Sequence, residues 1–252
     1  MKQLIKLSVV LFSTLCAAQW QPSPGSTWNY QIGSTPTDLA VNAQVYDIDG
    51  FDNDSTQVAE IHSASAKAVC YIDVGTWENW RPDAALFPKS VLGTTNGWPG
   101  ERWLDIRQVN LLAPIITARF QMCKDKGFDA IEADNVDGYT NKTGFPLTAT
   151  DQCNYNTWYA SVAHSLGLSI ALKNDTDQVP QLVAYFDFLV DEQCFQYNEC
   201  STLTPFINAG KAVFEVEYKS QPSKFCPKAN AMKLSSIKKD LSLDATPLVQ
   251  CN

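Results

Sequence analysis

The chain has 252 residues, of which 45% are hydrophobic and 18% charged. It can therefore bury the core of one domain and is too poor in charge to be a disordered segment. Its formal net charge of −8 argues against nucleic acid or an anionic membrane as a partner, because both recruit surfaces rich in Lys and Arg.

The N-terminus has the pattern of a secretory signal peptide. Lys2 and Lys6 precede an apolar run over residues 7–15, and small residues follow it. We predict that residues 1–18 are the signal peptide and that residues 19–252 form a single secreted, extracellular domain. No other stretch approaches the roughly 20 apolar residues of a transmembrane helix.

After a Pro-, Ser- and Gly-rich arm at 21–33, strand-like and helix-like segments alternate along the chain. Runs of β-branched and aromatic residues predict strands at 45–49, 68–73, 103–106, 130–134, 169–172, 186–190, 212–217 and 234–237. Longer periodic segments predict helices at 56–65, 109–126, 151–166, 176–184 and 201–209. This α/β alternation predicts a TIM-type (β/α)8 barrel in a single domain. A doubly wound open sheet is the alternative, but no Gly-x-Gly-x-x-Gly follows the first strand.

The cysteines indicate an oxidising compartment. One of the eight Cys lies in the predicted signal peptide, and the odd number that remains leaves at least one thiol unpaired. We expect disulfides between Cys194 and Cys200 and between Cys226 and Cys251, while Cys70 is either a buried small residue or half of a disulfide. No Cys-x-x-Cys pair or clustered His offers metal-binding spacing, so neither a metal nor another cofactor is expected.

Acidic residues lie at the C-terminal ends of most of the predicted strands. They are Asp47, Asp49, Asp73, Asp105, Asp134, Asp137, Asp191, Glu192, Glu215 and Glu217. A single acid at a strand end more often caps a helix or a turn. Their repetition favours a functional site, because the active site of a TIM barrel lies at the C-terminal ends of its strands.

Strand alternation selects two of these carboxylates. If Ile131 and Ala133 pack outward against helices, Asp134 points into the barrel, and Glu192 takes the corresponding place two strands further on. Two facing carboxylates are the minimum equipment for hydrolysing a glycosidic bond. Loop aromatic residues suit a sugar site because their ring faces cover the C–H surfaces of sugars. They are Trp77, Trp80, Trp98, Trp103, Tyr139 and Tyr218.

Longer motifs go beyond these general patterns. They are VYDIDGFD at 45–52, VCYID at 69–73 with GTWENWRPD at 75–83, GWPGERWLDIR at 97–107, GFDAIEADNVDGY at 127–139 and DEQCFQYNEC at 191–200. Together they resemble glycoside hydrolase family 114. The resemblance implies a cofactor-free endo-α-1,4-polygalactosaminidase that cuts the cationic, partly deacetylated galactosaminogalactans of fungal cell walls and biofilms.

The resemblance also implies roles for particular residues. Asp134 would be the nucleophile and Glu192 the acid/base of a retaining mechanism, by analogy with α-galactosidase-type barrels. The residues that would line the substrate groove are Asp47, Asp49, Tyr71, Trp80, Arg81, Asn135, Lys173, Gln193, Glu217 and Tyr218. Lys173 ends a buried strand, so we expect it to pair with an acid of the site.

Two other functions remain open. The chain could be a secreted glycan-binding barrel without catalysis, or a glycosidase for another α-linked polysaccharide. The intact carboxylate pair favours an enzyme, and the many acids favour a cationic polysaccharide as the substrate, because they attract its protonated amines. We expect a monomer with no nucleic-acid or membrane partner.

Overall fold

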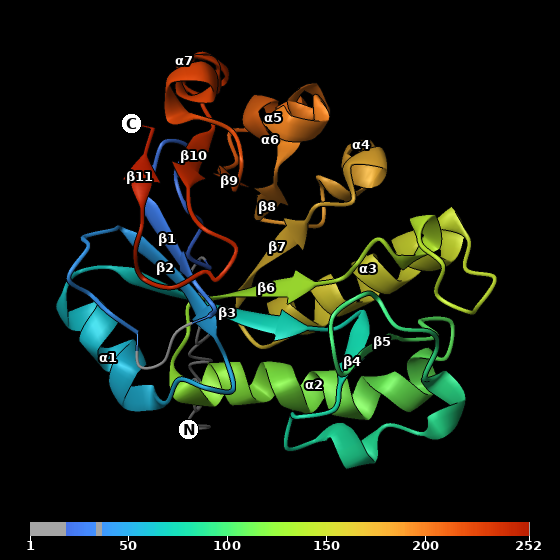
Figure 1. The fold of residues 1–252 in the computed structure, drawn as a ribbon. Helices are drawn as coiled ribbons and strands as arrows, with labels where there is room; N and C mark the ends of the chain where they lie inside the picture. Colours follow the sequence, from blue (N-terminus) through green and yellow to red (C-terminus); the bar gives the residue numbers. More distant parts are fainter. Residues whose placement is uncertain (1–18, 34–36, 252) are drawn as a thin grey trace, which may run out of the picture.

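Parallel strands form a nearly closed barrel in the part of the chain that the structure, a computed structural model, describes: residues 19–33 and 37–251 (Figure 1). In sheet order they are β1 (Trp28–Gln31), β2 (Val45–Asp49), β3 (Lys67–Asp73), β6 (Ala130–Asp134), β7 (Ser169–Lys173), β8 (Phe188–Glu192), β9 (Val213–Glu217) and β10 (Ser235–Lys238). A short strand, β11 (Val249–Gln250), runs antiparallel to β10. The predicted TIM-type barrel is therefore confirmed. The predicted signal peptide, residues 1–18, lies outside the described residues.

Side chains bridge the seam between β1 and β10. Trp28 Nε1 donates a 2.7 Å hydrogen bond to the carbonyl of Ser235, and Gln250 Nε2 donates one of 2.7 Å to the carbonyl of Trp28. Just after β10, the buried Lys239 Nζ donates to Asn29 Oδ1 at 2.7 Å. At this seam, side-chain hydrogen bonds therefore satisfy backbone carbonyl groups that would be paired by strand-to-strand hydrogen bonds in a continuous sheet.

One predicted barrel strand is wrong. The segment at 103–106 overlaps β5 (Glu101–Trp103), which pairs antiparallel with β4 (Thr76–Glu78) in a separate two-stranded ribbon. Its place among the eight parallel strands is taken by β1, inside the segment expected to be an irregular arm. Pro and Gly on both sides hid this four-residue strand, which forms because β2 provides its pairing partner.

Helices cover the outside of the barrel (Figure 1). They are α1 (Ser55–Ser63), α2 (Val109–Lys126), α3 (Ala149–Ser165), α4 (Val179–Leu182), α5 (Cys194–Tyr197), α6 (Thr204–Asn208) and α7 (Pro222–Met232). Short 3-10 turns are η1 (Ala84–Leu86), η2 (Lys89–Val91), η3 (Gly138–Thr140), η4 (Thr176–Gln178) and η5 (Cys200–Leu203). Local signals define several helix ends: Asp54 begins α1 with a capping box, and Gly127, at φ +92°, ends α2.

Two hydrophobic layers confirm the predicted alternation of β6. Ala130 belongs to the cluster that fills the barrel together with Trp28 and Phe214. Ile131 and Ala133 belong to the outer cluster, which packs the sheet against the helices. Asp134, an even number of residues from Ala130, therefore projects from the inner face at the C-terminal end of the strand.

Three disulfides join parts of this fold. Cys194–Cys200 and Cys226–Cys251 are present as predicted, and Cys70 of β3 is bonded to Cys123 of α2. Cys153 is the cysteine without a disulfide in the described part of the chain. Across the same residues, no helix has both the length and the apolar character required to span a membrane.

Candidate active site

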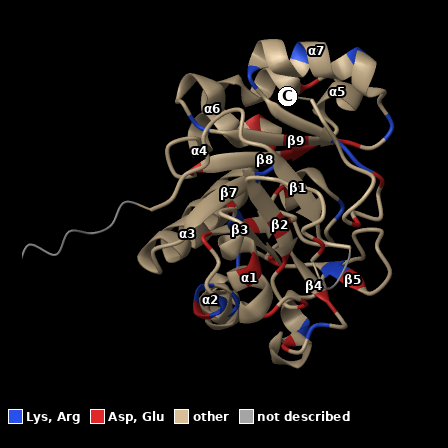
Figure 2. Ribbon diagram, turned by 90° about the vertical axis from the view of Figure 1, so that its left-hand side faces the viewer, with Lys and Arg blue, Asp and Glu red and all other residues tan. Residues whose placement is uncertain are grey.

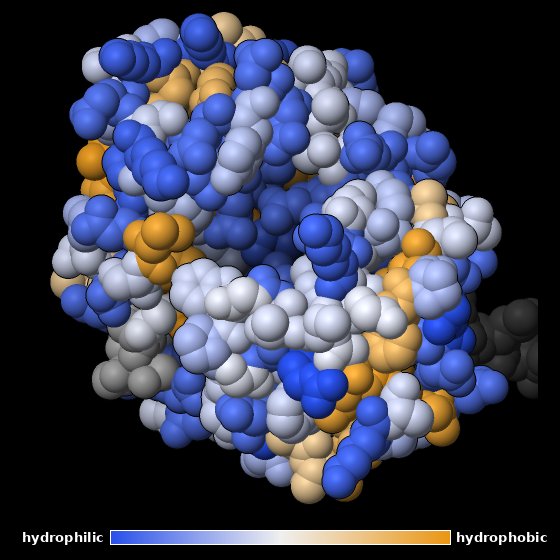
Figure 3. Space-filling view, turned by 45° about the vertical axis from the view of Figure 1, so that its right-hand side comes forward, coloured by the Kyte–Doolittle hydropathy of each residue, from blue (hydrophilic) through white to orange (hydrophobic). Residues whose placement is uncertain are grey.

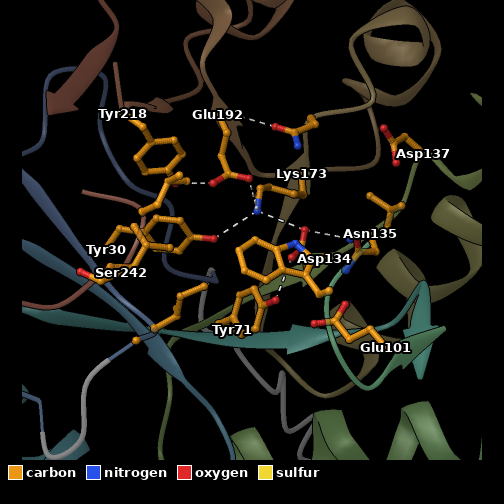
Figure 4. Close-up of a pocket in the computed structure, with 17 residues that line it drawn as sticks. Tyr30, Tyr71, Glu101, Asp134, Asn135, Asp137, Lys173, Glu192, Tyr218 and Ser242 are labelled. Atoms are coloured by element: carbon orange, nitrogen blue, oxygen red, sulfur yellow. Dashed lines mark hydrogen bonds and ion pairs between the residues drawn. The ribbon is translucent and has the colours of Figure 1, made fainter. Parts of the chain in front are cut away.

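A cavity of about 320 Å³ opens at the C-terminal ends of the barrel strands. The space-filling view shows a hollow with a hydrophilic floor on the side toward which the strands point (Figure 3). Six of the twelve residues predicted for the site line the cavity: Tyr71, Asp134, Asn135, Lys173, Glu192 and Tyr218. They come from β3, β6, β7, β8 and the segments that follow β6 and β9, and the close-up shows them gathered around one ammonium group (Figure 4).

Lys173 is at the centre of the site. Its Nζ lies 3.1 Å from Asp134 Oδ1, 3.5 Å from Glu192 Oε2 and 2.9 Å from Glu132 Oε1. Burial alone would lower the pKa of Lys173, but the surrounding carboxylates, Asp134 foremost, hold it well above its ordinary value. The side chain is thus a permanent cation, and the expected ion pair with an acid of the site is present.

Asp134 is held in its ionised form. Burial acts to raise its pKa, but the Lys173 ammonium and donated hydrogen bonds prevail, so the pKa lies below its ordinary value. Tyr71 OH donates to Oδ2 at 2.8 Å, and the backbone N–H of Asn135 donates to Oδ1 at 2.8 Å. Asn135 adopts φ +61°, a conformation that Asn tolerates better than most residues. An ionised, oriented carboxylate has the properties of a nucleophile.

Glu192 lies across the ammonium from Asp134. Tyr218 OH donates to its Oε1, and its backbone N–H donates to Asn174 Oδ1 at 3.0 Å. Its side chain is 28% exposed, compared with 18% for Asp134. Burial and the charge of Glu192 raise the pKa of Tyr218 well above its usual value, so Tyr218 remains a donor. Glu192 is therefore oriented by two contacts and still open to the cavity.

The shared ammonium sets the distance between the two carboxylates. Because one oxygen of each lies within 3.5 Å of Lys173 Nζ, these two oxygens are no more than about 7 Å apart. Their strands, β6 and β8, flank β7, as predicted from the sequence.

Asp47 lies beneath this site and does not line the cavity. It is 1% exposed, and neither of its carboxylate oxygens receives a hydrogen bond from a donor group. Burial, and then the charge of Glu132, raise its pKa well above the ordinary value. Burial thus favours the protonated form of Asp47, which lies next to Glu132, and Glu132 in turn contacts Lys173.

The other predicted site residues lie outside the cavity. Arg81 makes a bidentate ion pair with Asp49, at 2.9 and 2.6 Å, and also contacts Glu78. Glu217 accepts hydrogen bonds from the backbone N–H groups that begin α5. Gln193 precedes that helix with φ +68°, and its side chain donates to Gln196.

Two further predicted residues also lie away from the cavity. Trp80 is 52% exposed. Asp105, expected at a barrel strand end, follows β5 instead and pairs with Arg107.

Some cavity residues were not indicated by the sequence patterns. Tyr30, on the unpredicted strand β1, donates to Glu132 Oε1 at 3.0 Å. Glu101 comes from the β4–β5 ribbon, and Leu241–Leu243 come from the chain after β10. The alternation of aromatic and polar residues in Trp28–Gln31 is a strand pattern that could have indicated the position of Tyr30. The other contributions depend on how distant loops fold over the barrel.

Acidic residues are also abundant on the strands around the site, including β2 and β9 (Figure 2). Among the described residues, the atoms close enough to share a metal ion belong to Asp191, Cys194 and Glu215. Cys194 is in a disulfide, so its sulfur is not available as a thiolate ligand. These residues are not among those lining the cavity.

A TIM barrel with two carboxylates at the C-terminal ends of its strands is an arrangement typical of a glycoside hydrolase. The sequence profile of glycoside hydrolase family GH114 matches residues 12–252. The chain belongs to this family and is a glycoside hydrolase.

Solved structures support the assignment. The chain is similar to Ega3 of Aspergillus fumigatus, solved in complex with galactosamine, with 37% identity, a TM-score of 0.87, and coverage of 93% of this chain and 98% of Ega3. The glycoside hydrolase domain of PelA from Pseudomonas aeruginosa has 10% identity and a TM-score of 0.68, covering 90% of this chain and 98% of that domain, and so shares the fold. No curated protein matches the sequence.

Proposed function

We propose that the protein is an endo-acting hydrolase of α-1,4-linked galactosamine polymers, with Asp134 as the nucleophile and Glu192 as the acid/base. The observation that carries this proposal is the pair of carboxylates on β6 and β8, both in contact with the buried Lys173 at the barrel mouth. This arrangement provides one ionised carboxylate and one cavity-facing carboxyl group, as a glycosidase requires.

The substrate class rests on charge and on similarity. Ega3 was solved with galactosamine, and the present chain is 37% identical to it. Acids outnumber bases by eight in this chain, so a polymer of protonated amines is attracted to it. We therefore propose a cationic, partly deacetylated galactosaminogalactan, the polymer of fungal walls and biofilms, as the substrate.

The proposed mechanism is retaining. Asp134 attacks the anomeric carbon while the glycosidic C–O bond breaks and Glu192 transfers its proton to the leaving oxygen. Glu192 then removes a proton from water, the resulting hydroxide attacks the anomeric carbon, and Asp134 is released. Retaining pairs lie about 5 to 5.5 Å apart and inverting pairs about 6.5 to 9.5 Å. The limit that the shared ammonium imposes on the two oxygens favours the retaining route.

We further propose that residues 1–18 are removed as a signal peptide and that residues 19–252 act outside the cell as a monomer. The three disulfides support this, since such bonds persist in oxidising compartments. N-terminal sequencing of the protein from culture medium, with light scattering of the same sample, tests both points.

The activity is tested by incubating the purified protein with partly deacetylated galactosaminogalactan and with its fully N-acetylated form at low and high salt. Mass spectrometry should detect short galactosamine oligomers from the cationic polymer alone, released more slowly at high salt. Binding without products would favour a non-catalytic glycan-binding barrel. Products from a neutral α-linked polysaccharide, with none from the galactosamine polymers, would favour a glycosidase for another α-linked polysaccharide.

A further inference from the structure

A cavity of about 810 Å³, larger than the active-site cavity, is lined by α5, η5, α7 and the segment that precedes α7. Ligand-binding cavities usually measure about 300 to 1,000 Å³. The buried residues of its lining are all apolar: Cys194, Cys200 and Phe225. None of the described residues that line it is Asp or Glu, and its charged residues are the exposed Lys219, Lys224 and Lys228. The cavity therefore has an apolar floor and a cationic rim.

The three lysines of the rim have no compensating charge. No ion pair or side-chain hydrogen bond between described residues involves their ammonium groups. Lys224 and Lys228 lie one turn apart on α7, where like charges repel, and α7 contains no Asp or Glu (Figure 2). Lys224 is also in the first turn of α7, the positive end of the helix dipole, which the Gln221 side chain does not cap. An anion bound at the rim would relieve these repulsions.

The acids that lie near the cavity in the sequence are engaged elsewhere. Glu217 is buried and accepts hydrogen bonds from the backbone N–H groups that begin α5. Glu199 lines a different cavity, together with Asp175 and Asp177. In a chain with a formal net charge of −8, the rim is therefore a local region of positive potential.

The apolar part of the cavity extends toward the C-terminal end of α7. The rings of Phe195 and Phe225 lie with their centroids 5.6 Å apart in its wall. A neighbouring cavity of about 320 Å³ shares Ala231 and Met232 with it and adds the apolar Ile207. Met has a flexible side chain that adapts to the shape of an apolar partner. This elongated apolar path suits an extended hydrocarbon chain better than a compact ring.

Disulfides fix both walls of the cavity. Cys194–Cys200 joins α5 to η5, and Cys226–Cys251 joins α7 to the residue that follows β11. Because the walls are held in place without a ligand, binding requires little ordering of the protein.

We propose that this cavity binds an aliphatic carboxylate, the anion of a medium-chain fatty acid. The hydrocarbon chain lies against Phe225 and Met232, and the carboxylate lies among Lys219, Lys224 and Lys228. An acidic polysaccharide fits less well, because its hydroxyl groups would meet the apolar floor without hydrogen-bond partners. The cavity contains neither of the proposed catalytic carboxylates, so this binding site is additional to the proposed function.

The test is isothermal titration calorimetry of the purified protein with sodium decanoate and with 1-decanol, its uncharged analogue. We expect saturable binding of decanoate whose affinity falls as salt is added, and binding of decanol that salt does not weaken. A double variant, Lys224→Gln with Lys228→Gln, should bind decanoate about 10-fold more weakly and decanol as the wild type does. Both lysines are exposed, so their replacement removes charge from the rim and leaves the apolar floor intact.

Two further variants serve as controls. Ala231→Phe places a large side chain in the apolar part of the cavity from an exposed position on α7, so it should weaken the binding of both probes. Circular dichroism checks that it folds. Lys89→Gln with Lys142→Gln removes the same charge from exposed positions that do not line the cavity, and this double variant should bind both probes as the wild type does.

Three results would each overturn the assignment of the cavity. They are the absence of saturable decanoate binding to the wild type, a decanoate affinity that does not depend on salt, and equal effects of the two double lysine variants on that affinity. None of these measurements involves hydrolysis, so their outcome is independent of the proposed function.

Discussion

The ammonium nitrogen of Lys173 lies 3.1 Å from Oδ1 of Asp134, with both groups below the mouth of the barrel. This contact stabilises the ionised carboxylate and, through the second contact to Glu192, limits the distance between the two proposed catalytic carboxylates. The electrostatics of the site thus depend on one buried cation and on the acids around it.

Lys173→Met should destabilise the protein by about 3 to 5 kcal/mol, because it leaves Glu132 and Asp134 as buried acids without their cation. Urea unfolding measures this loss. The exposed Lys124→Met serves as the matched control and should change stability by less than about 0.5 kcal/mol. Equal stability of the two variants would mean that the ammonium does not compensate these acids.

Tyr71→Phe should shift the acidic limb of the pH profile of kcat/KM to higher pH. The hydroxyl donates to the ionised form of Asp134, so its removal favours the protonated form and raises the pKa of that group, by about one unit. Because the proposed mechanism requires an ionised Asp134, activity is then lost at a higher pH. The exposed Tyr185→Phe is the control. If the acidic limb of the Tyr71→Phe profile lies at the same pH as that of the wild type, the ionisation of Asp134 does not govern that limb.

Asp134→Asn and Glu192→Gln should each fold normally and lose hydrolysis. Removing the general acid lowers kcat by roughly 10²- to 10⁴-fold, and removing the nucleophile should cost at least as much. Circular dichroism checks the fold, and NMR of the first product identifies its anomeric configuration in the wild-type protein. Near wild-type activity in either variant would remove that residue from its role, and a β product from the α-linked substrate would exclude the retaining mechanism.

Asp191→Asn should stabilise the protein at neutral and alkaline pH. Burial, followed by the charges of Glu199 and Glu192, raises the pKa of Asp191 to about 8 in the folded protein, whereas the unfolded carboxyl ionises near its ordinary value of about 4. Between these values the folded state binds the extra proton, so wild-type stability falls as pH rises.

The variant should therefore gain more than about 1 kcal/mol over the wild type at pH 8 and little at pH 4. Urea unfolding at several pH values measures this difference. The exposed Asp240→Asn is the control. A constant difference between Asp191→Asn and the wild type across this range would show that Asp191 does not titrate abnormally.

Local sequence determined which face each strand residue occupies. The alternation of Ile131 and Ala133 with charged neighbours was sufficient to place Asp134 on the inner face, because the two-residue period is a property of the strand itself. The same reasoning selected Glu192. The strand bounds at Val45–Asp49 and Ala130–Asp134 were also predicted, since each is a short apolar run followed by turn residues.

Tertiary structure decided which of the acids meet in the active site. Asp49 is held by Arg81 and Glu217 by the start of α5, so neither faces the cavity, although their sequence context resembles that of Asp134. Tyr30 reaches the site on β1, a short strand that forms by pairing with β2 and that the sequence pattern alone did not predict. Periodicity specifies the direction of a side chain within its own strand, whereas its partners come from segments far away in the chain that only the closed barrel brings together.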